Sequence, residues 1–240
     1  VYDLNAKEMR DMRTKMQIIF QDPFSSLQPR MPVGEIIGEA VREHGLVSKE
    51  EFDDYIDQVM DNCGLQPFHK DRYPHEFSGG QRQRICIARA LITKPDLIIA
   101  DEPISALDVS IQAQVLNLLN DLRKELGLTI LFIAHDLSVV KYFSERVAVM
   151  NRGRIVEMAP SEMLYKNPVH PYTKSLLSAI PIPNPLLEKK RVRFEYNPSR
   201  HQYTPDDQPK MIEVEPGHLA FISQKEYENY PERVIEHAVK

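Results

Sequence analysis

Residues 97–134 contain the pattern that most limits how this chain can fold. The continuous apolar run LIIA, residues 97–100, precedes a helical pattern over 110–126 that ends before Gly127, and a second apolar run covers 129–134. A glycine after the last turn is a common helix C-cap, and such short apolar runs are typical of strands buried on both faces of a parallel sheet. Strand, helix and strand at this spacing predict a βαβ unit and therefore an α/β fold.

Polar side chains follow the ends of both predicted strands. Asp101 and Glu102 come directly after the first strand, and His135 follows the second. Because parallel strands end at the same edge of a sheet, we expect these side chains to lie close together. Two carboxylates and an imidazole can position charge for phosphoryl transfer. Each residue alone is a weak signal, since acidic strand ends are common and a lone histidine there is more often structural.

Another predicted helix begins at two consecutive glycines, in the stretch FSGGQRQR of residues 77–84. Ser78 and Gln81 match the S-x-x-Q capping box. A capping box does not require Gly79 and Gly80, and each glycine costs about 1 kcal/mol of helix propensity relative to alanine. A bare backbone at a helix N-terminus lets a phosphate approach the unpaired amides. We therefore expect an anion-binding site here, with simple helix capping as the alternative.

The remaining segments predict the domain organisation. Residues 15–21 form a short strand, 33–65 show helical amphipathic repeats, and the apolar runs around 151–153 predict a hairpin. Frequent prolines beyond residue 160 favour a loosely built extension over a second large core. The predicted organisation is an α/β domain over 1–160, with an inserted helical subdomain over about 33–92 and a core segment over about 93–158, then a proline-rich extension over 161–240.

Composition removes several classes of function. A net charge of −5 and a pI near 5.9 do not support nucleic-acid binding. Cys63 and Cys86 are far apart, so neither a disulfide framework nor a zinc site is indicated. The apolar run over 128–134 is much shorter than the roughly 20 residues that a membrane span needs. Any membrane contact is therefore expected to be peripheral.

The order of these motifs resembles that of the ATP-binding-cassette (ABC) ATPases, over about residues 16–158. The glycine motif, the LIIADE strand end, the SALD motif of 105–108 and His135 follow one another as they do in that family. The resemblance implies a P-loop NTPase-like core that uses ATP and Mg²⁺. It implies that Asp101 lies beside the magnesium, that Glu102 is the general base, and that His135 contacts the γ-phosphate.

The same resemblance assigns roles to the other motif residues. Gln21 corresponds to the glutamine that contacts magnesium and water and reports nucleotide state to the membrane subunits. The signature loop corresponds to residues 78–81, namely Ser78, Gly79, Gly80 and Gln81. In this family the loop meets the γ-phosphate held by the opposite subunit, and Asp108 links the two sites. The glycines would then serve a phosphate across a dimer interface.

Longer stretches resemble the second ATPase subunit of oligopeptide or dipeptide importers. They are residues 72–84, 103–119 and 167–185. Related nickel importers share much of this sequence, so the resemblance does not decide which solute is transported. The resemblance implies an unlike second ATPase subunit, two permease subunits, a solute-binding protein and a place on the inner face of the membrane. Some members carry cysteines for an iron–sulfur cluster in the extension. Since this chain has no cysteine after Cys86, we expect no cluster.

The phosphate loop G-x-x-x-x-G-K-[ST] is missing from these residues, because no glycine is followed by lysine. The sequence therefore resembles a cassette that is truncated before this loop, and we expect the chain alone to bind ATP weakly and to hydrolyse little. An alternative is a non-catalytic half-site that completes a partner's ATP site. A third class, the DNA-repair ABC proteins, would need a coiled-coil insertion and a basic surface, and the sequence shows neither.

Overall fold

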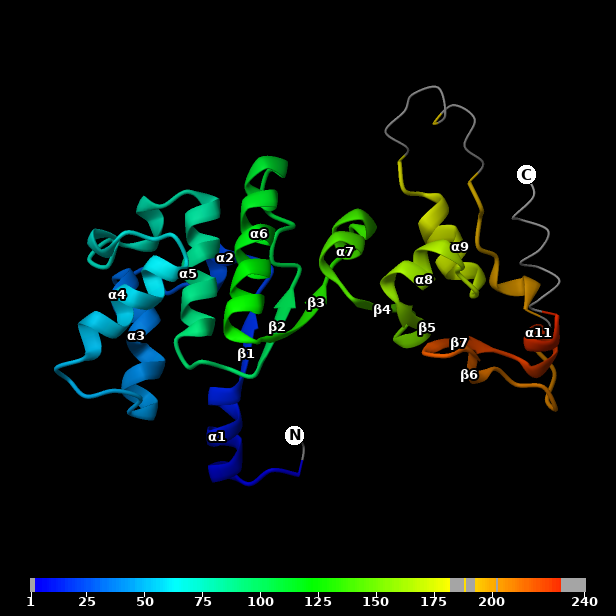
Figure 1. Ribbon diagram of the computed structural model, residues 1–240, viewed down its shortest axis with the longest axis horizontal. Coiled ribbons are helices and arrows are strands. Elements are labelled where there is room, and N and C mark those ends of the chain that lie inside the picture. The colour runs from blue at the N-terminus through cyan, green and yellow to red at the C-terminus, as the bar shows by residue number, and fades with distance from the viewer. Residues whose placement is uncertain (1–2, 182–187, 189–192, 202, 230–240) are drawn as a thin grey trace. The chain divides into compact units, whose positions relative to one another are not determined.

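A computed structural model describes residues 3–181, 188, 193–201 and 203–229 of the chain. Two compact units are present, Val1–His135 and Asp136–Lys240 (Figure 1). This division follows the packing of the chain. The boundary near residue 160 was predicted from the prolines that follow it, and it stays a prediction. Each unit is described by itself below.

The first unit contains a parallel sheet of three strands in the order β1-β2-β3. Its strands are β1 (Met16–Ile19), β2 (Leu97–Asp101) and β3 (Thr129–Ile133). Helix α6 (Val109–Leu126) connects β2 to β3 and ends at Gly127, which has a φ of 66° (Figure 1). Only glycine adopts this left-handed conformation without strain, so the cap needs the residue found there. The predicted βαβ unit and its parallel pairing are confirmed.

The two faces of this sheet differ in burial. On β2, Ile98 and Ala100 are completely buried, but on β3 the side chains of Leu131 and Ile133 are 53% and 43% exposed. The prediction that these strands are buried on both faces was therefore wrong. In the register, Ile18, Ile99 and Leu131 form one row across the sheet, so one apolar face is largely open within the described residues.

Helices build the rest of the first unit, and those within residues 33–65 lie where the amphipathic repeats predicted them. They are α1 (Ala6–Lys15), α2 (Pro23–Ser26), α3 (Val33–His44), α4 (Phe52–Asn62), the 3₁₀ turns η1 (Pro67–His69) and η2 (Pro74–Glu76), and α5 (Gly79–Leu91). Helix α5 packs against α2, α3, α4, α6 and β1. Its Ile85 and Ile87 are completely buried, so α5 is the central helix of this unit.

The second unit is built on an antiparallel sheet in the order β4-β5-β7-β6. Its elements are α7 (Leu137–Phe143), β4 (Arg146–Asn151), β5 (Arg154–Pro160), α8 (Ser161–Lys166), α9 (Pro171–Ser178), η3 (Pro198–Arg200), β6 (Lys210–Glu215), β7 (His218–Ile222) and α11 (Gln224–Glu228). The predicted hairpin is confirmed: Arg152 and Gly153, with φ of 48° and 79°, form its turn. Positive φ at both central residues is the twist that tight hairpins require.

The described part of the extension is more ordered than the proline content predicted. Strands β6 and β7 join the same sheet as the β4–β5 hairpin, because β7 pairs with β5 through Ala220 and Glu157. A small core of Val169, Ala220 and Ile222 lies beside them. The description "loosely built" was therefore wrong here. Pro209 and Pro216 lie just outside β6, where they break no ladder hydrogen bonds.

A buried carboxylate joins three segments of the second unit. The oxygens of Glu157 accept hydrogen bonds from the backbone nitrogens of Val169 (2.7 Å) and His170 (2.9 Å). The ring of His218 lies 2.7 Å from the same carboxylate, and neither side chain is exposed to solvent. Because an unpaired charge here would be costly, this group fixes β5, β7 and the entry to α9 together.

We expect mild acid to destabilise the second unit through His170. This residue is buried, and burial lowers the pKa of its ring to about 4, with His201 adding to the effect, while Glu157 and Glu226 oppose it. Its unfolded pKa is about 6.5, so the unfolded chain takes up a proton as the pH falls below 6.5 and the folded unit does not until about pH 4. Stability should therefore fall by about 3 kcal/mol across that window.

Thermal melting between pH 7 and pH 5 checks this expectation with the variant His170→Asn. The ring Nδ1 of His170 accepts a hydrogen bond from the backbone amide of Tyr172 and so caps α9. Asparagine can also cap a helix, but it does not titrate. The melting temperature of the variant should depend much less on pH between pH 7 and pH 5 than that of the natural protein. Glu226 contributes little to this dependence above pH 5. If the melting temperatures of the natural protein and the variant fell equally with pH, His170 would not be the titrating group.

Candidate functional site

Three of the predicted site residues meet around one carboxylate in the first unit. The side-chain nitrogen Nε2 of Gln21 donates a hydrogen bond to Oε2 of Glu102 at 2.7 Å. The ring Nδ1 of His135 lies 3.4 Å from the same oxygen. Gln21 follows β1, Glu102 follows β2 and His135 follows β3, so the ends of parallel strands bring them together. The convergence predicted for this edge of the sheet is confirmed for Glu102 and His135, and the structure adds Gln21 to them.

The backbone of Glu102 is held in an unusual conformation. Its φ is 45°, a left-handed value that costs a non-glycine residue of the order of 1 kcal/mol or more. Its amide donates to the carbonyl of Ile133 at 2.9 Å, and its own carbonyl accepts from the hydroxyl of Ser105 at 3.0 Å. These bonds hold the strained backbone in place, and the side chain of Glu102 is 27% exposed.

Asp101 is the last residue of β2 and pairs in register with Ile133 of β3. Together with the side-chain oxygen of Gln21 it offers the hard oxygen ligands that Mg²⁺ prefers. Among the described residues no cluster of three or more histidine, cysteine or acidic side chains could hold a metal ion. A magnesium ion bound mainly through phosphate oxygens and water needs only one or two such ligands, so the donor set fits that use.

The signature residues form the N-terminus of α5. The hydroxyl of Ser78 accepts from the amide of Gln81 at 3.3 Å, and the Gln81 side chain accepts from the amide of Ser78 at 3.0 Å. The predicted capping box is confirmed. A Cβ atom at Gly80 would lie 2.4 Å from Cγ2 of Ile111 on α6, whereas one at Gly79 would lie 3.5 Å from Leu107. Packing therefore explains Gly80 but does not explain Gly79.

This difference predicts opposite effects for two alanine substitutions. Gly80→Ala pushes a methyl group into Ile111, and overpacking of this kind costs about 1–3 kcal/mol. Gly79→Ala meets only an ordinary contact and gains helix propensity, so its stability should equal or exceed that of the natural protein. Denaturant titration of the two variants compares the free energies of unfolding. Equal stability of the two variants would contradict the packing role of Gly80.

Asp108 caps the helix that follows the SALD motif. Its carboxylate accepts hydrogen bonds from the hydroxyl of Ser110 at 2.8 Å and from the amide of Ile111 at 3.1 Å. These two bonds hold the pKa of Asp108 below its ordinary value, so the cap stays ionised. Leu107 and Ile111 approach Gly79 and Gly80, which places the SALD motif beside the signature loop.

The predicted site residues thus fall into two groups within the first unit. Gln21, Glu102 and His135 form the first, with Asp101 adjacent in sequence. Residues 78–81 and Asp108 form the second. Among the hydrogen bonds and ion pairs of the described residues, none joins the two groups.

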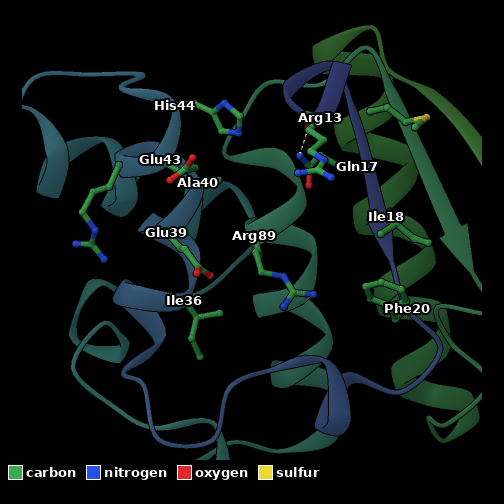
Figure 2. Close-up of a pocket in the computed structure, with 12 residues that line it drawn as sticks. Arg13, Gln17, Ile18, Phe20, Ile36, Glu39, Ala40, Glu43, His44 and Arg89 are labelled. Atoms are coloured by element: carbon green, nitrogen blue, oxygen red, sulfur yellow. Dashed lines mark hydrogen bonds between the residues drawn. The ribbon is translucent and has the colours of Figure 1, made fainter. Parts of the chain in front are cut away.

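A cleft of about 810 Å³ lies between β1 and α3, and the sequence did not predict it (Figure 2). Figure 2 shows Ile18 and Phe20 on one wall, Glu39 and Glu43 on the other, and Arg89 of α5 between them. Ile18 and Phe20 are 37% and 45% exposed. Arg89 was also missed, although Arg82 and Arg89, two turns apart on α5, could have signalled a contact face.

Within the described part of the chain, no helix has the length and apolar character to cross a membrane.

Two family models match the chain. The family described as ABC transporter matches residues 2–105. The family described as oligopeptide/dipeptide transporter, C-terminal region, matches residues 156–205.

Several curated proteins are similar over nearly the whole chain. The oligopeptide transport ATP-binding protein OppF of Bacillus subtilis is 55% identical over 227 residues, which cover 94% of this chain and 74% of that protein. The corresponding protein AmiF of Streptococcus pneumoniae is 53% identical, with 95% and 75% covered. The dipeptide transport ATP-binding protein DppF of Lactococcus lactis is 51% identical, with 96% and 73% covered.

Solved structures show a similar fold. CbiO1 of Clostridium perfringens, part of the ABC transporter complex CbiONQ, is 29% identical with a TM-score of 0.61, covering 68% of this chain and 64% of that one. The ATP-binding cassette MJ0796, in a dimeric post-hydrolysis state with ADP and phosphate, is 30% identical with a TM-score of 0.58, covering 66% and 68%.

Proposed function

The chain belongs to the family of ATP-binding proteins of oligopeptide and dipeptide ABC transporters, and from this premise we propose that it hydrolyses ATP to drive peptide uptake across the cytoplasmic membrane. One observation carries the proposal beyond the family name. Gln21 and His135 both reach the same oxygen of Glu102, at 2.7 Å and 3.4 Å. A carboxylate with an amide and an imidazole beside it is the constellation that nucleotide hydrolysis uses.

In the proposed mechanism Glu102 acts on the attacking water. Its carboxylate accepts the proton of the water as the nucleophile approaches the γ-phosphate, and it is exposed enough for a water molecule to reach it. Gln21 orients the carboxylate and the water through its amide group. His135 donates a hydrogen bond to the γ-phosphate oxygens, on which charge builds up. Hydrolysis needs such positioned charge more than covalent help.

Asp101 and Gln21 are the residues that would hold Mg²⁺ in this site. When bound, the ion neutralises charge on the phosphate oxygens. Asp101 is fixed by its place at the end of β2, and Gln21 by its bond to Glu102. The chain's part in this site is therefore to hold oxygen ligands at the end of a rigid sheet.

The signature loop serves a second nucleotide in this proposal. Packing in the first unit does not require a glycine at position 79. A phosphate that approaches the backbone of residues 78–81 from another subunit would explain why this position has no side chain. A second ATPase subunit would hold that phosphate, and we propose from the family resemblance that this subunit is related to the chain but not identical to it. Asp108 lies beside the loop and would couple the two sites.

The other proposed partners are two permease subunits and an external peptide-binding protein. We place the protein at the cytoplasmic face of the membrane as a peripheral subunit. The lysine-bearing phosphate loop is not among these 240 residues, because none of their glycines is followed by lysine. We therefore propose that these residues alone bind ATP weakly, and tests of activity need the natural protein together with its partners.

Uptake in cells tests the proposed function. A strain from which the gene is deleted should lose uptake of a labelled tetrapeptide, and the natural gene should restore it. Labelled Ni²⁺, measured in the same strains, should enter equally with and without the gene. Unchanged peptide uptake in the deletion strain, or loss of nickel uptake alone, would contradict a peptide-importing role.

A further inference from the structure

Helix α2 directly follows Gln21, and side chains of α5 hold it in place. The guanidinium of Arg89 donates a hydrogen bond to the carbonyl of Ser26, the last residue of α2. The sulfur of Cys86 lies 3.3 Å from the hydroxyl of Ser26. The guanidinium of Arg82 lies over the ring of Phe24, 5.2 Å from its centre. Positions 82, 86 and 89 lie on one face of a helix, so α5 presents a continuous contact surface to α2.

Helix α2 depends on these contacts because it is very short. It has four residues, and a helix of this length is not stable by itself in water. The carboxylate of Asp22 caps the N-terminus of α2, since it accepts a hydrogen bond from the amide of Phe24 at 2.9 Å. At the other end, a charged donor on the carbonyl of Ser26 supplies one of the stronger hydrogen bonds available to a backbone group. Arg89 therefore closes the C-terminus of α2.

We propose that Arg89 is a positioning residue for Gln21. By holding the carbonyl of Ser26, it fixes α2 and so fixes the backbone from which Gln21 reaches Glu102. Arg89 itself does not hydrogen-bond Glu102 or His135 among the contacts of the described residues. The proposal rests on the proposed function, because it treats the bond between Gln21 and Glu102 as part of ATP hydrolysis.

Arg84 provides a matched control on the same helix. Its NH1 nitrogen also donates to a backbone carbonyl, that of Cys63 at 2.9 Å, and its side chain is half-buried like that of Arg89. Cys63 is the C-cap of α4 and is distant in sequence from Gln21. The two arginines therefore share one helix and one kind of bond, but they hold different segments.

Hydrogen exchange in the natural protein, assembled with its partner subunits, tests the structural part of the proposal. Arg89→Gln should speed exchange of the amides of Phe24 and Ser26 by about tenfold or more, and Arg89→Lys, which keeps a donor, should restore most of the protection. Arg84→Gln should leave those amides unchanged and act near Cys63 instead. Unchanged exchange at α2 in Arg89→Gln would overturn the proposal.

Steady-state ATP hydrolysis by the same assemblies tests the functional part. Arg89→Gln should lower kcat about tenfold with KM for ATP within twofold, because positioning for the chemical step is lost and binding is kept. Arg84→Gln should keep kcat. A normal kcat in Arg89→Gln, despite faster exchange, would overturn the positioning role. Absence of ATP hydrolysis by the natural assembly would overturn the proposed function instead, and the exchange data would still decide whether Arg89 holds α2.

Discussion

Glu102→Gln is expected to abolish nearly all ATP hydrolysis by the assembled transporter while leaving ATP binding intact. Glutamine has the shape of glutamate but cannot accept the proton of the attacking water, and loss of a general base typically costs about 100-fold or more in rate. Gln21 and His135 would still meet a polar side chain of the same size. Phosphate release under saturating ATP, together with ATP-driven association of the two ATPase subunits, measures both properties.

The control for this substitution is Glu125→Gln, on an exposed position of α6. It makes the same chemical change and should leave turnover within twofold. The result also separates two functions. If the chain only completes the site of its partner, Glu102→Gln should change turnover little. A variant that keeps half or more of the natural rate would therefore favour the non-catalytic half-site.

Glu157→Leu should unfold the second unit under conditions in which the natural protein is folded. Leucine fills a similar volume, but it leaves His218 and the backbone amides of Val169 and His170 without their buried acceptor. Each buried donor that is left without its acceptor costs about 1–3 kcal/mol, so losing several is a large part of the stability of a small unit. Denaturant titration, with hydrogen exchange of β6 and β7 as the local signal, measures the loss.

Glu213→Leu is the matched control for this prediction. Glu213 lies on β6 of the same sheet and also accepts a backbone amide, that of Gly217 at 2.8 Å, but it is exposed. Water can replace its hydrogen bond, so we expect a change below about 1 kcal/mol. Similar stabilities of the two variants would show that the buried position of Glu157 does not govern the folding of the second unit.

The elements with a strong period could be predicted from the sequence. Helix α6 with Gly127, the βαβ unit and the capping box at Ser78 all follow from local spacing, and the structure agrees with them. Burial was harder to predict, since apolar residues occupy both faces of β3 and the sequence does not say which face is covered. Strands β6 and β7 were not predicted because prolines surround them, although prolines outside a strand do not prevent its pairing.

The candidate site also has features that could be predicted from the sequence and features that could not. The approach of His135 to Glu102 follows from parallel strand ends and was predicted, whereas the bond from Gln21 to Glu102 was not. The packing of Gly80 against Ile111 and the bond from Arg89 to Ser26 join segments that are distant in the sequence, so no local pattern states them. Long-range contacts of this kind become visible only when the helices are placed in space.

The most direct test of the account measures phosphate release and uptake of labelled peptide in the same vesicles, with the natural protein assembled in its transporter. We expect both rates to rise together when ATP and the peptide-loaded binding protein are present, and both to be lost in Glu102→Gln. Peptide uptake and phosphate release that continue at the natural rates in Glu102→Gln would contradict the claim that this subunit hydrolyses ATP to drive transport.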